Sequence, residues 1–131
     1  LLGHHDENHY LLYFGFSTLK YSATNYFSAS NHIFHTLLMR VSMYFFGDEN
    51  EVAIRLPSFI SGIACLWLIY LTSCAIFRSQ LIANFALLAA ALNPIHILYS
   101  QTARGYGLLM FLSILTLFAL IKFLETKHFV R

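Results

Sequence analysis

Two polar clusters of this chain carry side chains that could do chemistry. Asp6 and Glu7 form an adjacent acidic pair, and Arg104 lies within the stretch Ser-Gln-Thr-Ala-Arg-Gly-Tyr-Gly at 100–107. Neighbouring carboxylates repel each other, which suits one of them to take a proton from a hydroxyl. A guanidinium can hold a phosphate through two parallel N–H groups. The pattern suits a site that grips a phosphate and deprotonates a hydroxyl, and the alternative for the acidic pair is a solvated loop with no chemical role.

Further polar and aromatic residues could contact the same phosphate-bearing ligand. His32 and His35 are three residues apart, so they share one face of a helix, and Gln101 and Tyr106 flank Arg104. Imidazoles in this arrangement can hydrogen-bond a phosphate or a carboxylate. The alternative is structural, with interfacial histidines and a loop arginine paired with a nearby acid of the 48–51 segment.

A metal site near the start of the chain is the other chemical interpretation of the acidic pair. His5 and His9 are four residues apart, with Asp6 and Glu7 between them. The metalloprotease pattern requires Glu directly after the first His, and Asp6 occupies that position. We therefore predict no metal site at these residues.

The composition indicates an integral membrane protein. The 131 residues are 58% hydrophobic and 11% charged, against roughly 25% charged in ordinary soluble domains. Asp, Glu, Lys and Arg are absent from 56–77, 79–103 and 105–121, and each of these segments is long enough for a span of about 17–25 residues. Too few charges remain to coat three soluble helices. The net charge of +2 gives no reason to expect a nucleic-acid partner.

The predicted fold is all-α, a polytopic membrane protein fragment with three transmembrane helices and one amphipathic juxtamembrane helix. We predict a loop at 1–50 containing the juxtamembrane helix at about 31–46, spans at 51–78, 79–100 and 106–125, a second loop at 101–106 and a tail at 126–131. We also expect the chain to be part of a longer polytopic protein. Three spans place residues 1–55 and the 101–106 loop on one side of the membrane.

Local signals mark the ends of these helices. Asn31 is a suitable N-cap and Gly47 a suitable stop for the amphipathic helix, whose apolar stripe should lie in the membrane interface. Pro57 should lie in the first turn of the next helix, where its missing N–H costs little. Asn93-Pro94 should break the second span locally.

The distribution of basic residues does not orient the chain strongly. Lys20, Arg40, Arg55 and Arg104 lie on one predicted side, and Arg78, Lys122, Lys127 and Arg131 lie on the other. The clustering of the second set near span ends favours that side as cytoplasmic.

Four stretches resemble membrane glycosyltransferases of the GT-C fold, the group of protein O-mannosyltransferases and aminoarabinose transferases. They are His-Asp-Glu at 5–7, Ser-Asn-His-Ile-Phe-His-Thr-Leu-Leu at 30–38, Phe-Gly-Asp-Glu with Ile-Arg-Leu-Pro-Ser-Phe within 46–59, and Asn-Pro-Ile-His-Ile-Leu-Tyr-Ser-Gln-Thr-Ala-Arg-Gly-Tyr-Gly at 93–107. The Arg-Leu-Pro-Ser and Ser-Gln-x-Ala-Arg-x-Tyr elements are the most specific. The family's usual His-Pro-Pro is replaced here by Asn31-His32-Ile33.

The resemblance implies a function and a site. The enzyme would move a sugar from a polyprenyl-phosphate donor to a hydroxyl of a lipid, glycan or protein acceptor, with inversion, at the extracytoplasmic face of the cell membrane. Asp6 would be the base and Glu7 would orient it. Arg104 would stabilise the leaving phosphate, with His32, His35, Tyr106 and Gln101 as further donor contacts. No metal is required, although some relatives use one.

Two other classes of function remain open from the residues alone. A transporter or channel would also place polar residues near spans, and it should show ionisable residues or broken helices at mid-membrane. A non-catalytic membrane scaffold would tolerate loss of Asp6 and Arg104.

Overall fold

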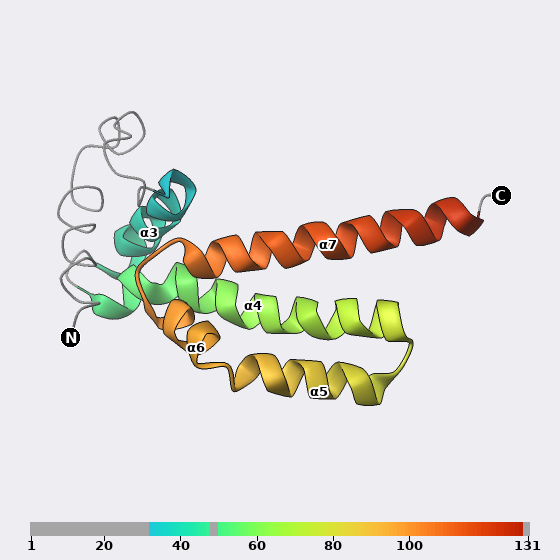
Figure 1. Cartoon of the computed structure of the whole chain (residues 1–131). Coiled ribbons are helices and arrows are strands. Elements are labelled where there is room, and N and C mark those ends of the chain that lie inside the picture. Colours follow the sequence, from blue (N-terminus) through green and yellow to red (C-terminus); the bar gives the residue numbers. More distant parts are fainter. Residues whose placement is uncertain (1–31, 48–49, 130–131) are drawn as a thin grey trace.

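A computed structural model describes residues 32–47 and 50–129, and the secondary structure within these ranges is entirely helical. The helices are α3 (Ile33–Phe46), α4 (Glu51–Phe77), α5 (Gln80–Ala91), α6 (Pro94–Gln101) and α7 (Tyr106–Phe129). Figure 1 shows α4 in the middle of a bundle, with α7 along one side of it and α5 and α6 along another. The predicted all-α fold class is confirmed.

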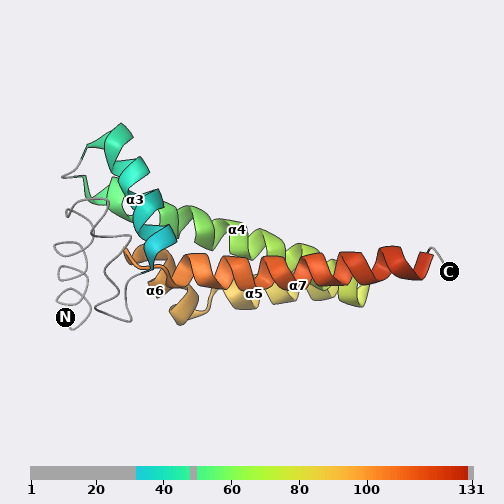
Figure 2. The same cartoon turned by 90° about the horizontal axis from the view of Figure 1, so that it is seen from above.

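Helix α4 is the scaffold of this bundle, since it packs against each of the other four described helices. Both views place α3 at the end of the bundle where α7 begins, at an angle to the long helices (Figures 1 and 2). The α6–α7 loop reaches the same end. The elements that carry His32, His35, Arg104 and Tyr106 therefore come together there.

Two described helices are long and apolar enough to cross a membrane by themselves, α4 over Glu51–Phe77 and α7 over Tyr106–Thr126. The 27 residues of α4 correspond to a length of about 40 Å, more than a hydrocarbon core of about 30 Å. Helices α5 and α6 qualify as a third span if the bent pair is counted together. The number of candidate spans thus agrees with the sequence.

The break in the second predicted span is sharper than the local break expected at Asn93-Pro94, because the pair α5 and α6 is bent by 61°. Asn93 caps α6 by accepting hydrogen bonds from the backbone N–H groups of Ile95 (2.9 Å) and His96 (3.4 Å), and Pro94 follows as the first helical residue. The new cap starts a second helix in a new direction. Helix α6 then packs on the N-terminal half of α4, where a methyl group on Gly62 would lie 2.7 Å from Cβ of Ser100.

The start of α4 differs from prediction in the position of its proline. Asn50 caps the helix by accepting from the N–H of Val52 at 2.9 Å, so Pro57 is the seventh helical residue and lies beyond the first turn. The prediction for Pro57 was therefore wrong. Because proline has no N–H, the carbonyl of Ala53 receives no hydrogen bond from position 57. Ser61 donates its hydroxyl to the carbonyl of Pro57 at 2.7 Å.

The face of α3 that carries both polar and apolar side chains is buried, and its apolar stripe is exposed. Its buried residues are His35, Thr36, Met39, Ser42 and Met43, whereas Phe34, Val41, Tyr44, Phe45 and Phe46 are exposed. A soluble protein would bury the aromatic stripe, so the exposed stripe fits a helix that rests on lipid. Gly47 ends the helix as predicted, at a φ of 96° that favours glycine. The N-cap is His32 rather than Asn31.

The inward face of α3 forms a small core with α4 and with the loop that follows α6. This core consists of Met39, Met43, Ala53, Ile54 and Ala103. Ala103 is fully buried, although its loop joins two helices at the end of the bundle. The loop is therefore held by packing, which sets the position of the next residue, Arg104.

Candidate functional site

The backbone of Arg104 is attached to α4 by a side chain. The hydroxyl of Ser58 donates a hydrogen bond to the carbonyl oxygen of Arg104 at 3.0 Å, and Ser58 is fully buried. Ser58 and Arg104 belong to the Arg-Leu-Pro-Ser and Ser-Gln-x-Ala-Arg-x-Tyr elements, respectively. The two most specific motifs of the sequence thus meet in one hydrogen bond across 46 residues of chain.

Glycines on either side of Tyr106 allow the loop to lie close to its neighbours. A methyl group on Gly105 would lie 2.5 Å from both Cβ and Cγ of His32. One on Gly107 would lie 3.1 Å from the carbonyl oxygen of Tyr99 and 3.2 Å from that of Ser58. Space, rather than an unusual φ, accounts for both glycines. The contact at Gly105 seats the ring of His32 directly against the loop that carries Arg104.

His35, on α3, forms a hydrogen bond with the same serine, Ser58. His35 is fully buried, and its Nε2 lies 2.9 Å from the hydroxyl oxygen of Ser58. Burial, with a smaller contribution from the nearby His32, lowers the pKa of His35 to about 4. His35 is therefore a neutral imidazole at physiological pH.

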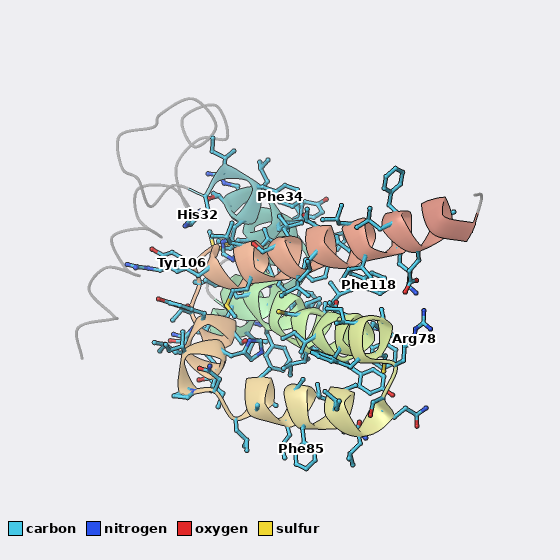
Figure 3. All side chains as sticks on the ribbon, turned by 45° about the vertical axis from the view of Figure 1, so that its right-hand side comes forward. His32, Phe34, Arg78, Phe85, Tyr106 and Phe118 are labelled. Carbon is cyan, nitrogen blue, oxygen red and sulfur yellow. The ribbon has the colours of Figure 1, made fainter. Side chains whose placement is uncertain are left out.

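His32 lies between aromatic and cationic neighbours. Its ring packs edge-to-face on Tyr106, with 5.2 Å between centroids, and Tyr106 in turn lies 4.9 Å from the ring of Tyr99. Partial burial, followed by the positive charge of Arg104, lowers the pKa of His32. The labelled His32 and Tyr106 lie together at this end of the bundle (Figure 3).

A cleft of about 240 Å³ opens beside these residues, between the start of α3 and the first turns of α7. Its lining residues are His32, Ile33, Phe34, His35, Gly105, Leu108, Leu109 and Leu112. One part of the cleft thus has imidazoles and loop backbone, and the rest has leucines of a helix long enough to span the membrane. Such a cleft suits an amphipathic ligand with a polar head and an apolar chain.

The structure brings together four of the residues proposed from the sequence and separates one. His32, His35, Arg104 and Tyr106 share the site described above. Gln101 is exposed and lines a different cleft of about 360 Å³ between α4 and α6, together with Glu51, Arg55 and Phe59. No described contact joins Gln101 to the histidines.

Other sequence interpretations have different outcomes. Arg55 pairs with Glu51 of the same helix, with 3.9 Å between its Nη1 and the carboxylate, so this arginine has a structural partner. Asp6 and Glu7, like the histidines at 5 and 9, lie outside the described residues, so their roles stay predictions. Within the described ranges, no three His, Cys, Asp or Glu side chains are grouped as a metal site.

Sequence reasoning gave no role to Ser58 or Gly105. Ser58 lay inside a motif already noted as specific, and a serine directly after a proline in an apolar span was the available signal. Nothing in the sequence showed that it would reach both His35 and Arg104. Gly105 could have been singled out only by knowing that His32 would pack against it.

The fold and this site define a class of protein, a helical membrane protein with a cation, two neutral imidazoles and an amphipathic cleft at one end of its bundle. Residues 30–130 match the dolichyl-phosphate-mannose-protein mannosyltransferase family, and the chain belongs to that family. It is therefore of the membrane glycosyltransferase type. No curated protein and no solved structure matches the chain significantly.

Proposed function

We propose that this chain forms part of an enzyme that transfers a sugar from a polyprenyl-phosphate donor to a hydroxyl acceptor at the extracytoplasmic face of the cell membrane. Family membership supports the class of reaction. The observation that carries the finer proposal is the attachment of the Arg104 loop to Ser58, beside a cleft that ends in leucines of α7.

The cleft supports a particular arrangement of the donor. Leu108, Leu109 and Leu112 offer an apolar wall to the first isoprene units, and this wall continues along a membrane-spanning helix. The phosphate would lie near Arg104, and the sugar near His32 and His35. Because the cleft is smaller than the roughly 300–1,000 Å³ of a drug-sized ligand site, it takes the head and the first isoprene units of the lipid and not the whole molecule.

The reaction in this arrangement is a direct displacement. The acceptor oxygen forms a bond to the anomeric carbon from the face opposite the phosphate, and the bond between that carbon and the phosphate oxygen breaks. The electron pair goes to the phosphate, and the hydroxyl proton goes to Asp6, with Glu7 orienting that carboxylate. Arg104 offsets the charge that grows on the phosphate, and a residue in this role can contribute about 10²–10³ in rate.

The proposal is tested with the full-length protein and dolichyl-phosphate mannose carrying labelled mannose. We expect transfer of label to a hydroxyl acceptor, a loss of about 10²-fold or more in Arg104→Ala, and a smaller loss in Arg104→Lys, which keeps the charge but not the bidentate geometry. Lys122→Ala removes a cation from the far part of α7 and is the control. Equal rates in the wild type and Asp6→Asn would remove Asp6 from the chemistry.

One observation favours the alternative of a transporter. The sharp break between α5 and α6 is the kind of interruption found where transporters bind cargo. Membership of a glycosyltransferase family weighs against this alternative. Movement of polyprenyl-phosphate sugar across a vesicle membrane, without transfer to any acceptor, would favour transport instead.

A further inference from the structure

The hydrogen bonds around Ser58 determine which nitrogen of His35 carries its proton. Ser58 has one hydroxyl proton, and its bond to the Arg104 carbonyl at 3.0 Å uses that proton, because a carbonyl oxygen can only accept. The contact of 2.9 Å between Ser58 and His35 must therefore be donated by the Nε2–H of the histidine. In a neutral ring this leaves Nδ1 without a proton, as a hydrogen-bond acceptor.

The remaining nitrogen of this ring has no partner in the described part of the chain. Nδ1 of His35 is buried and receives no hydrogen bond there, and the same holds for Nε2 of His32. A buried polar atom without a partner costs free energy, so it calls for a ligand or another compensation. Both histidines line the cleft between α3 and α7.

The chemistry of an acceptor restricts what this part of the cleft can bind. The phosphate of a polyprenyl-phosphate sugar is a diester, joined to both the lipid and the sugar. Its oxygens carry lone pairs and no proton, so they cannot donate a hydrogen bond to Nδ1. A hydroxyl can donate, and the sugar is the part of a polyprenyl-phosphate donor that is rich in hydroxyls. His35 also stays neutral, since burial, with a smaller contribution from the neighbouring His32, lowers its pKa to about 4.

We propose that His35 is a specificity-determining residue whose Nδ1 accepts a hydrogen bond from one hydroxyl of the donor's sugar, while Ser58 holds the ring in the required tautomer. This inference rests on the proposed function. In this arrangement His35 recognises the sugar and Arg104 binds the phosphate. Ser58 acts through His35 and the Arg104 backbone and is a positioning residue.

The test uses the full-length protein with dolichyl-phosphate mannose and a series of analogues that each lack one sugar hydroxyl. We expect the wild type to disfavour one analogue by about threefold to tenfold in kcat/KM, the usual effect of one neutral hydrogen bond. In His35→Gln the amide N–H can still donate to Ser58, but the remaining acceptor, the amide oxygen, does not lie at the position of Nδ1. This variant should transfer from that analogue and from the parent donor equally well, with little change in thermal stability.

The control is His96→Gln, the same substitution at a second buried histidine whose Nδ1 also lacks a partner among the described residues. His96 lies outside the α3–α7 cleft, so its variant should discriminate as the wild type does. If His35→Gln discriminates between the analogues as the wild type does, the proposal is wrong. If the wild type transfers from none of these donors, the proposed function itself fails, which is a different result.

A measurement on the wild type gives an answer that does not depend on a variant folding. Nitrogen NMR of protein labelled at histidine should show Nδ1 of His35 unprotonated, with a resonance that moves on addition of dolichyl-phosphate mannose. Dolichyl phosphate alone, which has no sugar, should leave that resonance in place. A protonated Nδ1, or an equal response to both lipids, would overturn the assignment.

Discussion

At the scale of residues, the site depends on one buried hydroxyl. Ser58 contacts a histidine of α3 and the backbone of the loop before α7, so three elements meet at a single atom. The Arg-Leu-Pro-Ser element therefore has a structural meaning, since its serine positions the arginine of the other motif. The arginine that we propose to stabilise the leaving phosphate is thus held at this end of the bundle by its main chain.

Gly105→Ala is expected to displace the ring of His32 and lower activity. The added methyl group would lie 2.5 Å from Cβ and Cγ of His32, and these atoms cannot move without shifting the ring or the loop. Because misplacement by about 1 Å can cost up to 10²-fold in rate, we expect kcat/KM to fall by about tenfold or more, with a raised KM for the donor. Steady-state kinetics of the full-length protein would measure this. Unchanged kinetics would show that the contact between Gly105 and His32 is dispensable.

The buried His35 should also make stability depend on pH. Its folded-state pKa of about 4 lies below the ordinary histidine value of 6.5, so the folded state binds fewer protons than the unfolded state between these values. The stability that comes from neutral His35 is fully present above pH 6.5 and is lost as the pH falls toward 4. We expect the unfolding midpoint to fall over this window, and to fall less in His35→Gln. Equal pH dependence of the unfolding midpoint in both proteins would contradict the effect of burying His35. Part of the pH dependence that remains in His35→Gln is expected to come from His32, whose pKa is also lowered.

At the scale of elements, the surroundings of each described helix, and not its average composition, decide which of its faces is buried. Helix α3 buries His35 and Met39 and exposes its aromatic stripe, while α5 buries only Ala83 fully and exposes Leu81 and Phe85. Phe85 points away from the bundle in Figure 3. In α5 the large side chains are exposed and the small Ala83 is buried, as expected where lipid takes the place of water.

Ala83→Val should weaken the packing of α5 on α4, whereas Ala89→Val should not. Ala83 is fully buried and Ala89 is exposed on the same helix, so the pair separates overpacking from the effect of valine on the helix itself. Inserting two methyl groups into a tight contact costs about 1–3 kcal/mol. Thermal unfolding of the full-length protein in detergent should show a lower midpoint for Ala83→Val alone. Equal unfolding midpoints for both variants would show that Ala83 does not contribute to the packing of α5 on α4.

At the scale of the whole molecule, the described bundle has two unlike ends. One end carries His32 and Tyr106, and the other carries Arg78 with the turn into α5, as Figure 3 shows. Arg104 belongs to the first end, where its carbonyl oxygen accepts a hydrogen bond from Ser58. The amphipathic cleft opens only at the first end, since its lining comes from the starts of α3 and α7. If these ends lie on opposite sides of a membrane, the donor head is confined to one face. The extracytoplasmic assignment of that face stays a proposal.

Cysteine accessibility can test whether α5 and α6 together form one span. Gln80 and Gln101 are exposed and lie at the two ends of the bent pair. In a background with Cys65 and Cys74 replaced by alanine, Gln80→Cys and Gln101→Cys should react with a membrane-impermeant reagent from opposite sides of sealed vesicles. Labelling of both from the same side would show a re-entrant pair and change the number of crossings.

Composition and local pattern were enough for the helical class and the candidate spans. The absence of charge over 56–77 and 105–121 reflects the cost of placing ions in hydrocarbon, which each segment meets by itself. Gly47 and Asn93-Pro94 acted as predicted because caps and prolines affect the residues next to them. The stripe of α3 was also readable, since helical periodicity decides which residues share a face.

The site itself depended on contacts between residues far apart in the chain. No local rule brings Ser58 to Arg104, seats His32 on Gly105, or turns Gln101 into a different cleft. The position of Pro57 was missed for a different reason, because the local cap at Asn50 starts α4 earlier than its proline indicated. Periodicity and capping act over a few residues, whereas burial and hydrogen bonding between helices arise only once the chain has folded back on itself.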